Sequence, residues 1–175
     1  MKKEYVMPIL ALSLICLFVA GALAVAHAIT QPIIKIAAAE RAAVAMRDIM
    51  PYAEAFEPLE LEGLPGPVDS IFRTTNNVGY IFVVTTQGFS GGITILCGID
   101  PEGRVIRTTV LSHSETPTFS APVFAESHAG QFWGRDRYGI EGVDVVARST
   151  LTSIAYRDAI RYAFAAFDIA TGGAR

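Results

Sequence analysis

The feature that most constrains this chain is an apolar run over residues 5–29. No Asp, Glu, Lys or Arg occurs in these 25 residues. A helix that crosses a bilayer needs about 20 apolar residues, whereas the apolar core of a signal peptide has only about 7–15. The stretch 26–28 resembles a small-residue cleavage site, so a cleaved signal peptide is the alternative. The length favours an uncleaved transmembrane helix, and we expect residues 1–33 to form an anchor.

The charges that flank this run bear on its orientation. Lys2 and Lys3 precede it, while Lys35, Arg41 and Arg47 follow it, so loop charge alone gives weak evidence. The short N-terminal tail predicts a cytoplasmic N-terminus. We therefore expect a single-pass protein of the cell (inner) membrane with its domain on the outer, periplasmic side.

Composition excludes several classes of function. The 175 residues allow one domain besides the anchor, and a net charge of −3 without a basic patch argues against nucleic acid as a partner. The two cysteines, Cys16 and Cys97, suggest no disulfide framework. The three histidines lie in different segments without ligand spacing, so no metal site is predicted. No Gly-rich dinucleotide fingerprint follows a predicted strand, which argues against a nicotinamide site.

Residues 34–67 are expected to join the anchor to the domain. Residues 34–50 are Ala-rich and predict a helical stalk that Pro51 ends. Residues 52–67 are rich in Pro, Gly and Glu and predict an irregular, solvated acidic connector. The domain itself is expected over residues 68–175.

Four β-branched or aromatic runs predict strands in this domain, at residues 70–75, 80–86, 93–99 and 105–111. Asn/Gly and Asp-Pro-Glu-Gly turns separate the first pair and the last pair. Residues 139–146 are expected to be a loop that enters another short strand. Consecutive strands followed by helices predict an α+β domain with a largely antiparallel sheet and flanking helices.

An amphipathic helix is predicted over residues 151–169. Its expected apolar face consists of Ala155, Ala159, Tyr162, Ala163, Ala166 and Ala170. Four hydroxyl residues stand at its start: Ser149, Thr150, Thr152 and Ser153. A hydroxyl there is an ordinary N-cap, and the same helix end offers free N–H groups and a positive dipole end to a phosphate.

Residues 144–153 resemble the flavinylation motif of the FMN-binding domain family. That family includes the G subunit of the Rnf electron-transport complex and the C subunit of the sodium-pumping NADH:quinone reductase. Its pattern is Asp, two variable residues, Ser/Thr, Gly, Ala, and the Thr that carries FMN through a phosphoester. Asp144 and Thr150 match the first and last positions, and a trailing Thr-Ser pair follows. The three positions between them differ: Ala147, Arg148 and Ser149.

A second resemblance lies at the end of the fourth predicted strand. The family has a loop of the form His-x-Glu-Thr-Pro-Gly-Leu-Gly there, which lies against the flavin. The matching residues are His113, Glu115, Thr116 and Pro117, and Thr118, Phe119 and Ser120 replace Gly-Leu-Gly. The segment 124–134 also resembles a family helix that ends in Gln-Phe. The likeness covers about residues 78–168 in family order.

The resemblance implies one FMN, linked to Thr150 through a phosphoester. The implied cofactor-binding residues are Thr150, Asp144, Arg148, Ser149, Leu151, Thr152, His113, Glu115, Thr116, Pro117 and Thr118. Asp144 would belong to the motif that a flavin transferase recognises. Arg148 could pair with the phosphate, because a guanidinium forms two parallel hydrogen bonds to its oxygens.

The function implied is that of an electron-carrying flavoprotein subunit in an Rnf-like ion-translocating ferredoxin:NAD oxidoreductase complex. Its partners would be other membrane subunits and the flavin transferase, and no independent catalytic turnover is expected. The alternative is a flavin-free, membrane-anchored binding or assembly module that keeps the fold. The departures at residues 147–149 and 118–120 motivate this alternative.

Overall fold

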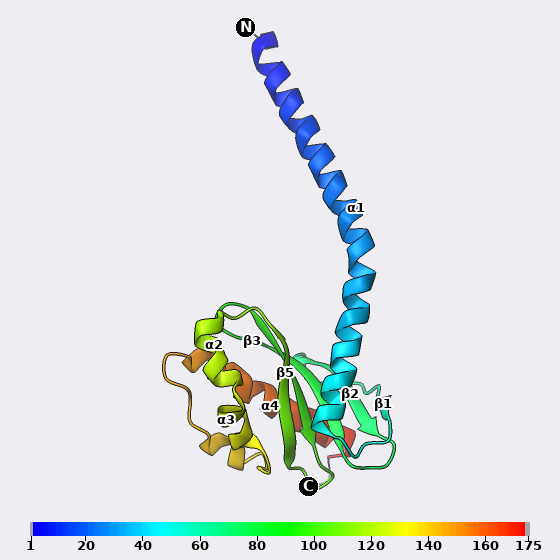
Figure 1. The fold of residues 1–175 in the computed structure, drawn as a ribbon, viewed down its shortest axis with the longest axis vertical. Helices are drawn as coiled ribbons and strands as arrows, with labels where there is room; N and C mark the ends of the chain where they lie inside the picture. The colour runs from blue at the N-terminus through cyan, green and yellow to red at the C-terminus, as the bar shows by residue number, and fades with distance from the viewer. Residues whose placement is uncertain (1, 174–175) are drawn as a thin grey trace. The chain divides into compact units, whose positions relative to one another are not determined.

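The computed structural model describes residues 2–173, and the chain divides after Arg41 into two compact units. Helix α1, Lys2–Ile49, provides the described residues of the first unit, and its last residues belong to the second (Figure 1). The predicted helical stalk over residues 34–50 is part of this same helix, which ends before Pro51. Pro32 lies inside α1, where it removes one backbone donor without ending the helix.

Among the described residues, one helix is long and apolar enough to cross a membrane. It is Met7–Ile49, and its most apolar window has a mean hydropathy of 2.8. Most large apolar side chains of this segment are exposed, including Leu17, Phe18 and Leu23, whereas Met46 and Ile49 near its end are buried. A long run of exposed apolar side chains on a helix is typical of contact with lipid or with another apolar surface.

The second unit contains a five-stranded antiparallel sheet in the order β1-β2-β3-β4-β5. The strands are β1 Phe56–Pro58, β2 Val68–Thr74, β3 Tyr80–Gln87, β4 Gly92–Ile99 and β5 Val105–His113. The four predicted strands are confirmed. β1 was missed, because its three residues lie in the predicted irregular connector and become a strand only by pairing with residues 72–74.

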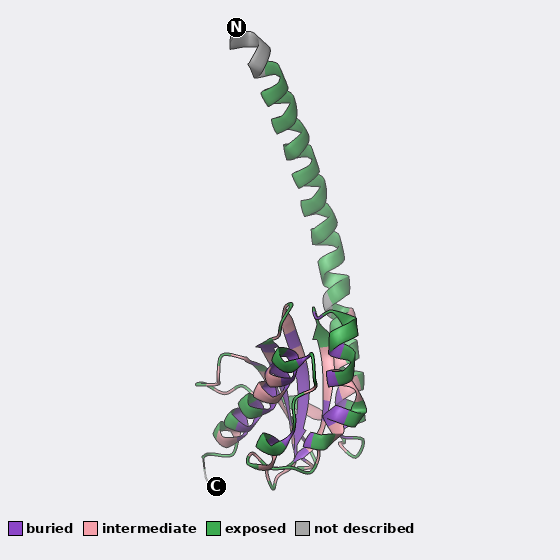
Figure 2. Cartoon of the chain, turned by 90° about the vertical axis from the view of Figure 1, so that its left-hand side faces the viewer, coloured by how far each residue is buried: buried purple, intermediate pink, exposed green. Residues whose placement is uncertain are grey.

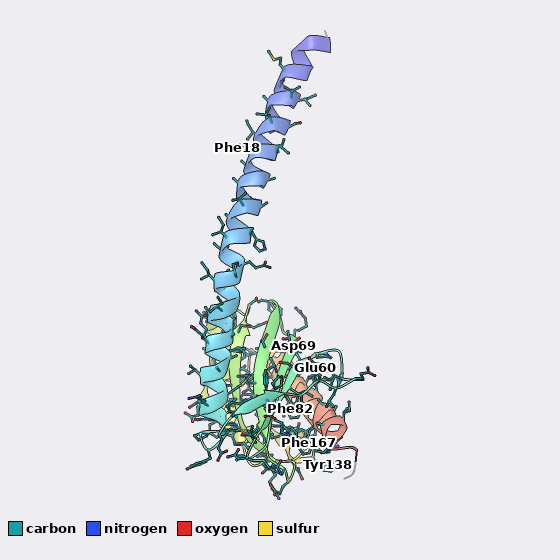
Figure 3. The ribbon with its side chains drawn as sticks, turned by 90° about the vertical axis from the view of Figure 1, so that its right-hand side faces the viewer. Phe18, Glu60, Asp69, Phe82, Tyr138 and Phe167 are labelled. Atoms are coloured by element: carbon teal, nitrogen blue, oxygen red, sulfur yellow. The ribbon has the colours of Figure 1, made fainter. Side chains whose placement is uncertain are left out.

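Helix α4, Thr150–Ala170, packs on one face of the sheet. Phe167 of α4 meets Phe82 of β3 edge to face, with ring centroids 6.4 Å apart (Figure 3). The expected apolar face was partly wrong, because Tyr162 is 38% exposed. The larger buried side chains of α4 are Tyr156, Ile160, Phe164 and Phe167. Residues of β3 and β4 are buried along most of their length, as the purple strands of Figure 2 show.

The opposite face of the sheet is covered by the end of α1. Met46, Ile49 and Met50 form a second buried cluster with residues of β3 and β4. This approach requires Gly98, because a Cβ there would meet Ile49 Cγ2 at 2.4 Å. The central strands β3 and β4 are therefore buried on both faces, whereas β2 and β5 are partly exposed.

Short helices connect β5 to α4. They are α2 Pro117–Phe124, α3 Glu126–Ala129 and the 3₁₀ helices η1 Gly130–Phe132 and η2 Gly139–Gly142. The expected loop therefore becomes helical at Pro117, whose fixed φ suits the first turn of a helix. The expected strand before residue 146 does not form within the described residues, because that β-branched segment has no strand partner.

Candidate functional site

A pocket of about 350 Å³ lies at the start of α4. Three segments far apart in the sequence form it: the β3–β4 turn, the loop after β5, and residues 148–152. Its lining consists of Phe89, Ser90, Glu115, Thr116, Phe119, Arg148, Ser149, Thr150, Leu151 and Thr152. The predicted proximity of the two family-like motifs is confirmed for Glu115 and Thr116.

The hydroxyls at this helix start are in different environments. Three are buried and engaged: Ser149 Oγ donates to the carbonyl of Phe119, Thr152 Oγ1 donates to Glu115 Oε2 at 3.0 Å, and Ser153 Oγ donates to the carbonyl of Ser149. Thr150 is exposed, and its hydroxyl has no hydrogen-bond partner among the residues the structure describes. Thr150 is thus the hydroxyl of this group that is free to react.

The first turn of α4 is uncapped by side chains. Ser149 is the N-cap residue but makes no side-chain cap hydrogen bond, so the expected hydroxyl cap is wrong. Its hydroxyl is directed to Phe119 instead. The N–H groups of the first turn have no intrahelical acceptor, and such groups, with the positive end of a 21-residue helix, favour an anion.

Arg148 has a left-handed backbone, with φ of +66°. This conformation costs a residue with a side chain roughly 1–2 kcal/mol, and Gly adopts it freely. The family pattern has Gly here, so the chain keeps a glycine-like backbone shape although the residue differs. The Arg148 side chain is exposed, lines the pocket and has no ion pair within the described part of the chain.

Glu115 fixes the pocket walls to one another. Its side chain is 6% exposed. One carboxylate oxygen accepts the Ser90 N–H at 2.8 Å and the other accepts the Thr152 hydroxyl. A Cβ at Gly88 would lie 2.4 Å from Glu115 Oε1, so this position requires glycine for space. The carboxylate therefore joins all three segments, and no metal-binding cluster occurs among the described residues.

Apolar side chains surround the pocket opening. Phe89, Phe119 and Leu151 are 73%, 49% and 57% exposed. Neither phenyl ring packs against another aromatic ring in the described structure. Sequence reasoning missed Phe89 and Ser90, because the segment was interpreted only as a break between strands. An aromatic residue within a Gly-rich turn is the signal that could have indicated them.

Four predicted site residues do not line this pocket. His113 is exposed and its ring lies 4.8 Å from that of Phe124, beside a different groove. Asp144 is exposed in the segment before α4, and Pro117 and Thr118 are exposed in the first turn of α2. The structure thus gathers Glu115, Thr116 and residues 148–152, and leaves the others outside the lining.

Comparison with known proteins assigns this region to a family. The model of the FMN-binding domain matches residues 88–165. The chain is 30% identical to the G subunit of the ion-translocating oxidoreductase complex of Methanosarcina acetivorans, over 93% of this chain and 94% of that protein. It is 26% identical to the G subunit of the proton-translocating ferredoxin:NAD(+) oxidoreductase complex of Clostridium ljungdahlii, over 58% and 60% of the two chains. It is 34% identical to the G subunit of the ion-translocating oxidoreductase complex of Stutzerimonas stutzeri, over 62% and 51%.

Proposed function

This chain belongs to the family of G subunits of ion-translocating oxidoreductase complexes, and from that premise we propose that FMN is esterified to Thr150 and relays electrons. The coarser function follows from membership: a membrane-anchored flavoprotein of ion-translocating electron transport, working with other subunits. The observation that carries the finer proposal is the free, exposed hydroxyl of Thr150 beside three engaged ones.

The residues present fit a flavin phosphate. The donor would be an activated flavin phosphate, in which the FMN phosphorus is joined to a second phosphate through a phosphoanhydride oxygen. The Thr150 oxygen would bond to the FMN phosphorus, the phosphoanhydride bond would break, the second phosphate would leave with the bridging oxygen, and the hydroxyl proton would pass to a base of the transferase or to water. A flavin transferase would bring that donor and recognise the segment that begins at Asp144. The first-turn N–H groups of α4 and the Arg148 guanidinium would hold the phosphate oxygens.

The remaining lining fits the ring system. FMN supplies the redox chemistry, and the chain supplies position and surroundings. Phe89, Phe119 and Leu151 offer apolar surface to a planar heterocycle. Thr116 provides a hydroxyl, and Glu115 holds the walls. His113, Pro117 and Thr118 would act indirectly, by shaping the loop that carries Glu115 and Thr116.

The electron path is proposed from the relatives. One relative is named as the G subunit of a ferredoxin:NAD(+) oxidoreductase complex. We propose that the complex containing this chain catalyses the same class of reaction. Electrons would pass between FMN and cofactors held by other subunits of that complex.

The proposed topology has a cytoplasmic N-terminus and the domain outside the membrane. N-terminal sequencing of the mature protein tests whether the anchor is retained. A mature start at Ile29 would refute the retained anchor.

Intact mass after co-expression with a flavin transferase tests the covalent site. The unmodified chain should gain one FMN less one water, and Thr150→Ala should gain nothing. Thr150→Ser keeps the hydroxyl and serves as the matched control, which should retain measurable flavin. Covalent flavin on Thr150→Ala would move the site to Ser149 or Thr152. A wild-type chain without flavin would favour the flavin-free assembly module.

A further inference from the structure

The two edges of the sheet differ in how far other segments of the chain pair with them. On one edge, the connector covers β2 through β1 and through backbone bonds such as Leu59 N–H to the Ile71 carbonyl at 2.9 Å. On the other edge, Val105 exchanges hydrogen bonds with Gly134 and Arg135. Beyond Val105, no residue of β5 has a backbone partner on its outer side in the described structure.

The open part of β5 also lacks the usual protection of edge strands. Residues 108–112 contain no charge and no proline, two of the devices that prevent pairing with another chain, although the register with β4 is irregular at either end of the strand. The register with β4 skips Ile106 and Leu111, so residues 107–110 form the regular part of the edge. Arg107 is the charged residue of this part and pairs with Asp48 and Glu126. An edge whose other residues are uncharged and β-prone is a template for another strand.

A groove of about 510 Å³ runs beside this edge. Residues 107–113 of β5 form one side, and Phe124 and Trp133 contribute to the other. Extended peptides that add to a sheet edge use main-chain hydrogen bonds for affinity and adjacent side-chain pockets for specificity. This groove therefore provides a side-chain pocket directly beside the unpaired main-chain groups of β5.

The charge at the groove selects the kind of segment. Asp48 and Glu126 both bond to Arg107, at 3.3 and 2.9 Å, and their side chains are 62% and 72% exposed. The Arg107 guanidinium also lies 4.7 Å from the Trp133 ring centroid. Two carboxylates share one cation, so the groove has one uncompensated negative charge and complements a positive side chain.

We propose that β5 and this groove bind an extended, lysine- or arginine-bearing segment of another subunit of the complex, which adds a strand to the sheet. The occupant is a subunit because members of this family work in complexes, and its charge follows from Asp48 and Glu126. The proposal does not depend on FMN or on Thr150, so a failure of the flavin site leaves it intact.

Hydrogen–deuterium exchange gives the first test. The full-length chain in detergent is compared with the same chain in its purified complex. Amides within residues 107–112 should exchange on the order of tenfold or more slowly in the complex. Equal exchange in both states would overturn the proposal. Slow exchange that appears in the isolated chain as its concentration rises would also overturn it, because the occupant would then be a second copy.

Charge reversal gives the second test. Glu126→Lys should weaken retention of the subunit in the complex and remove the added protection. Glu102→Lys makes the same change at an exposed carboxylate in the β4–β5 turn and should do neither. Circular dichroism and melting establish that both variants fold. A folded Glu126→Lys chain that assembles with full protection of β5 would overturn the proposed cationic segment.

Discussion

The pocket at α4 and the groove at β5 differ in how their polar groups are satisfied. In the pocket, Glu115, Ser149 and Thr152 bond to protein partners, and Thr150 is left free. In the groove, outer backbone groups have no partner among the described residues, and two exposed carboxylates share Arg107. A site whose polar groups are already fixed suits a small ligand, whereas unpaired backbone beside a groove suits another chain.

The largest expected effect tests whether Glu115 holds the pocket rigid. Glu115→Ala removes the acceptor of the buried Thr152 hydroxyl and of the Ser90 N–H. We expect the free energy of unfolding to fall by about 1–3 kcal/mol, the cost of leaving a buried donor unpaired. Chemical denaturation of the flavin-free chain measures this loss. Flavin occupancy should fall as well, since the walls lose their common partner.

A matched carboxylate shows whether this effect is specific. Glu102→Ala changes an exposed side chain in a turn and should alter stability by no more than about 0.5 kcal/mol. Equal losses in the two variants would contradict a special role for Glu115. They would also remove the contrast between a fixed pocket and an open groove.

The stability of the fold at alkaline pH depends on two buried groups near the groove, Tyr156 and Cys97. Burial raises the pKa of the Tyr156 phenol, which lines the groove and bonds Thr108, and burial also raises the pKa of the Cys97 thiol. Both groups stay neutral in the folded state, whereas the unfolded chain loses their protons above about pH 8.5 for Cys and pH 10 for Tyr. Stability should therefore be unaffected by them below these values and fall above them.

The expected slope is about 1.4 kcal/mol per pH unit for each group that ionises only on unfolding. Denaturation midpoints between pH 8 and pH 11 measure it. Cys97→Ala should remove the first part of the fall and Tyr156→Phe the second. A wild-type slope that persists in both variants would show that these residues are not the groups responsible.

The smallest expected effect concerns Arg148. Arg148→Gly relieves a left-handed backbone, which is worth roughly 1–2 kcal/mol, but it adds freedom to the unfolded chain worth roughly 0.5–1 kcal/mol. The net gain should be about 0–1.5 kcal/mol, and flavin occupancy should rise if the side chain hinders the transferase. Ala147→Gly is the neighbouring control and should lose stability. A loss in both variants would contradict strain at Arg148.

Much of the fold was predictable from local patterns. The four long strands follow from β-branched runs between turn residues, and α4 follows from apolar spacing. β1 was not predictable, because three residues without a run of their own depend on pairing with β2. The end of α1 before Pro51 was predictable as well, because proline cannot continue a helix.

Only those residues of the candidate site that belong to a recognisable motif were predictable from the sequence. Residues 148–152 and Glu115 came from motifs, but the contribution of the β3–β4 turn did not, because only the folded sheet brings Phe89 beside α4. His113 and Glu115 are two residues apart, which in a continuing strand would place them on one face. Strand β5 ends at His113, so His113 lines the groove at β5 and Glu115 lines the pocket at α4.

The Glu115 contacts also bear on the order of folding and cofactor attachment. Glu115 joins Ser90 to Thr152, so the pocket is complete only after segments separated by about sixty residues have met. Strands β3 to β5 are synthesised before α4, and an unfolded chain presents Thr150 without its surroundings. If FMN is esterified to Thr150 as we propose, and the transferase acts on the assembled pocket, attachment follows folding. The flavin-bearing fraction of newly made protein would then record how many chains had reached the native state when the transferase acted.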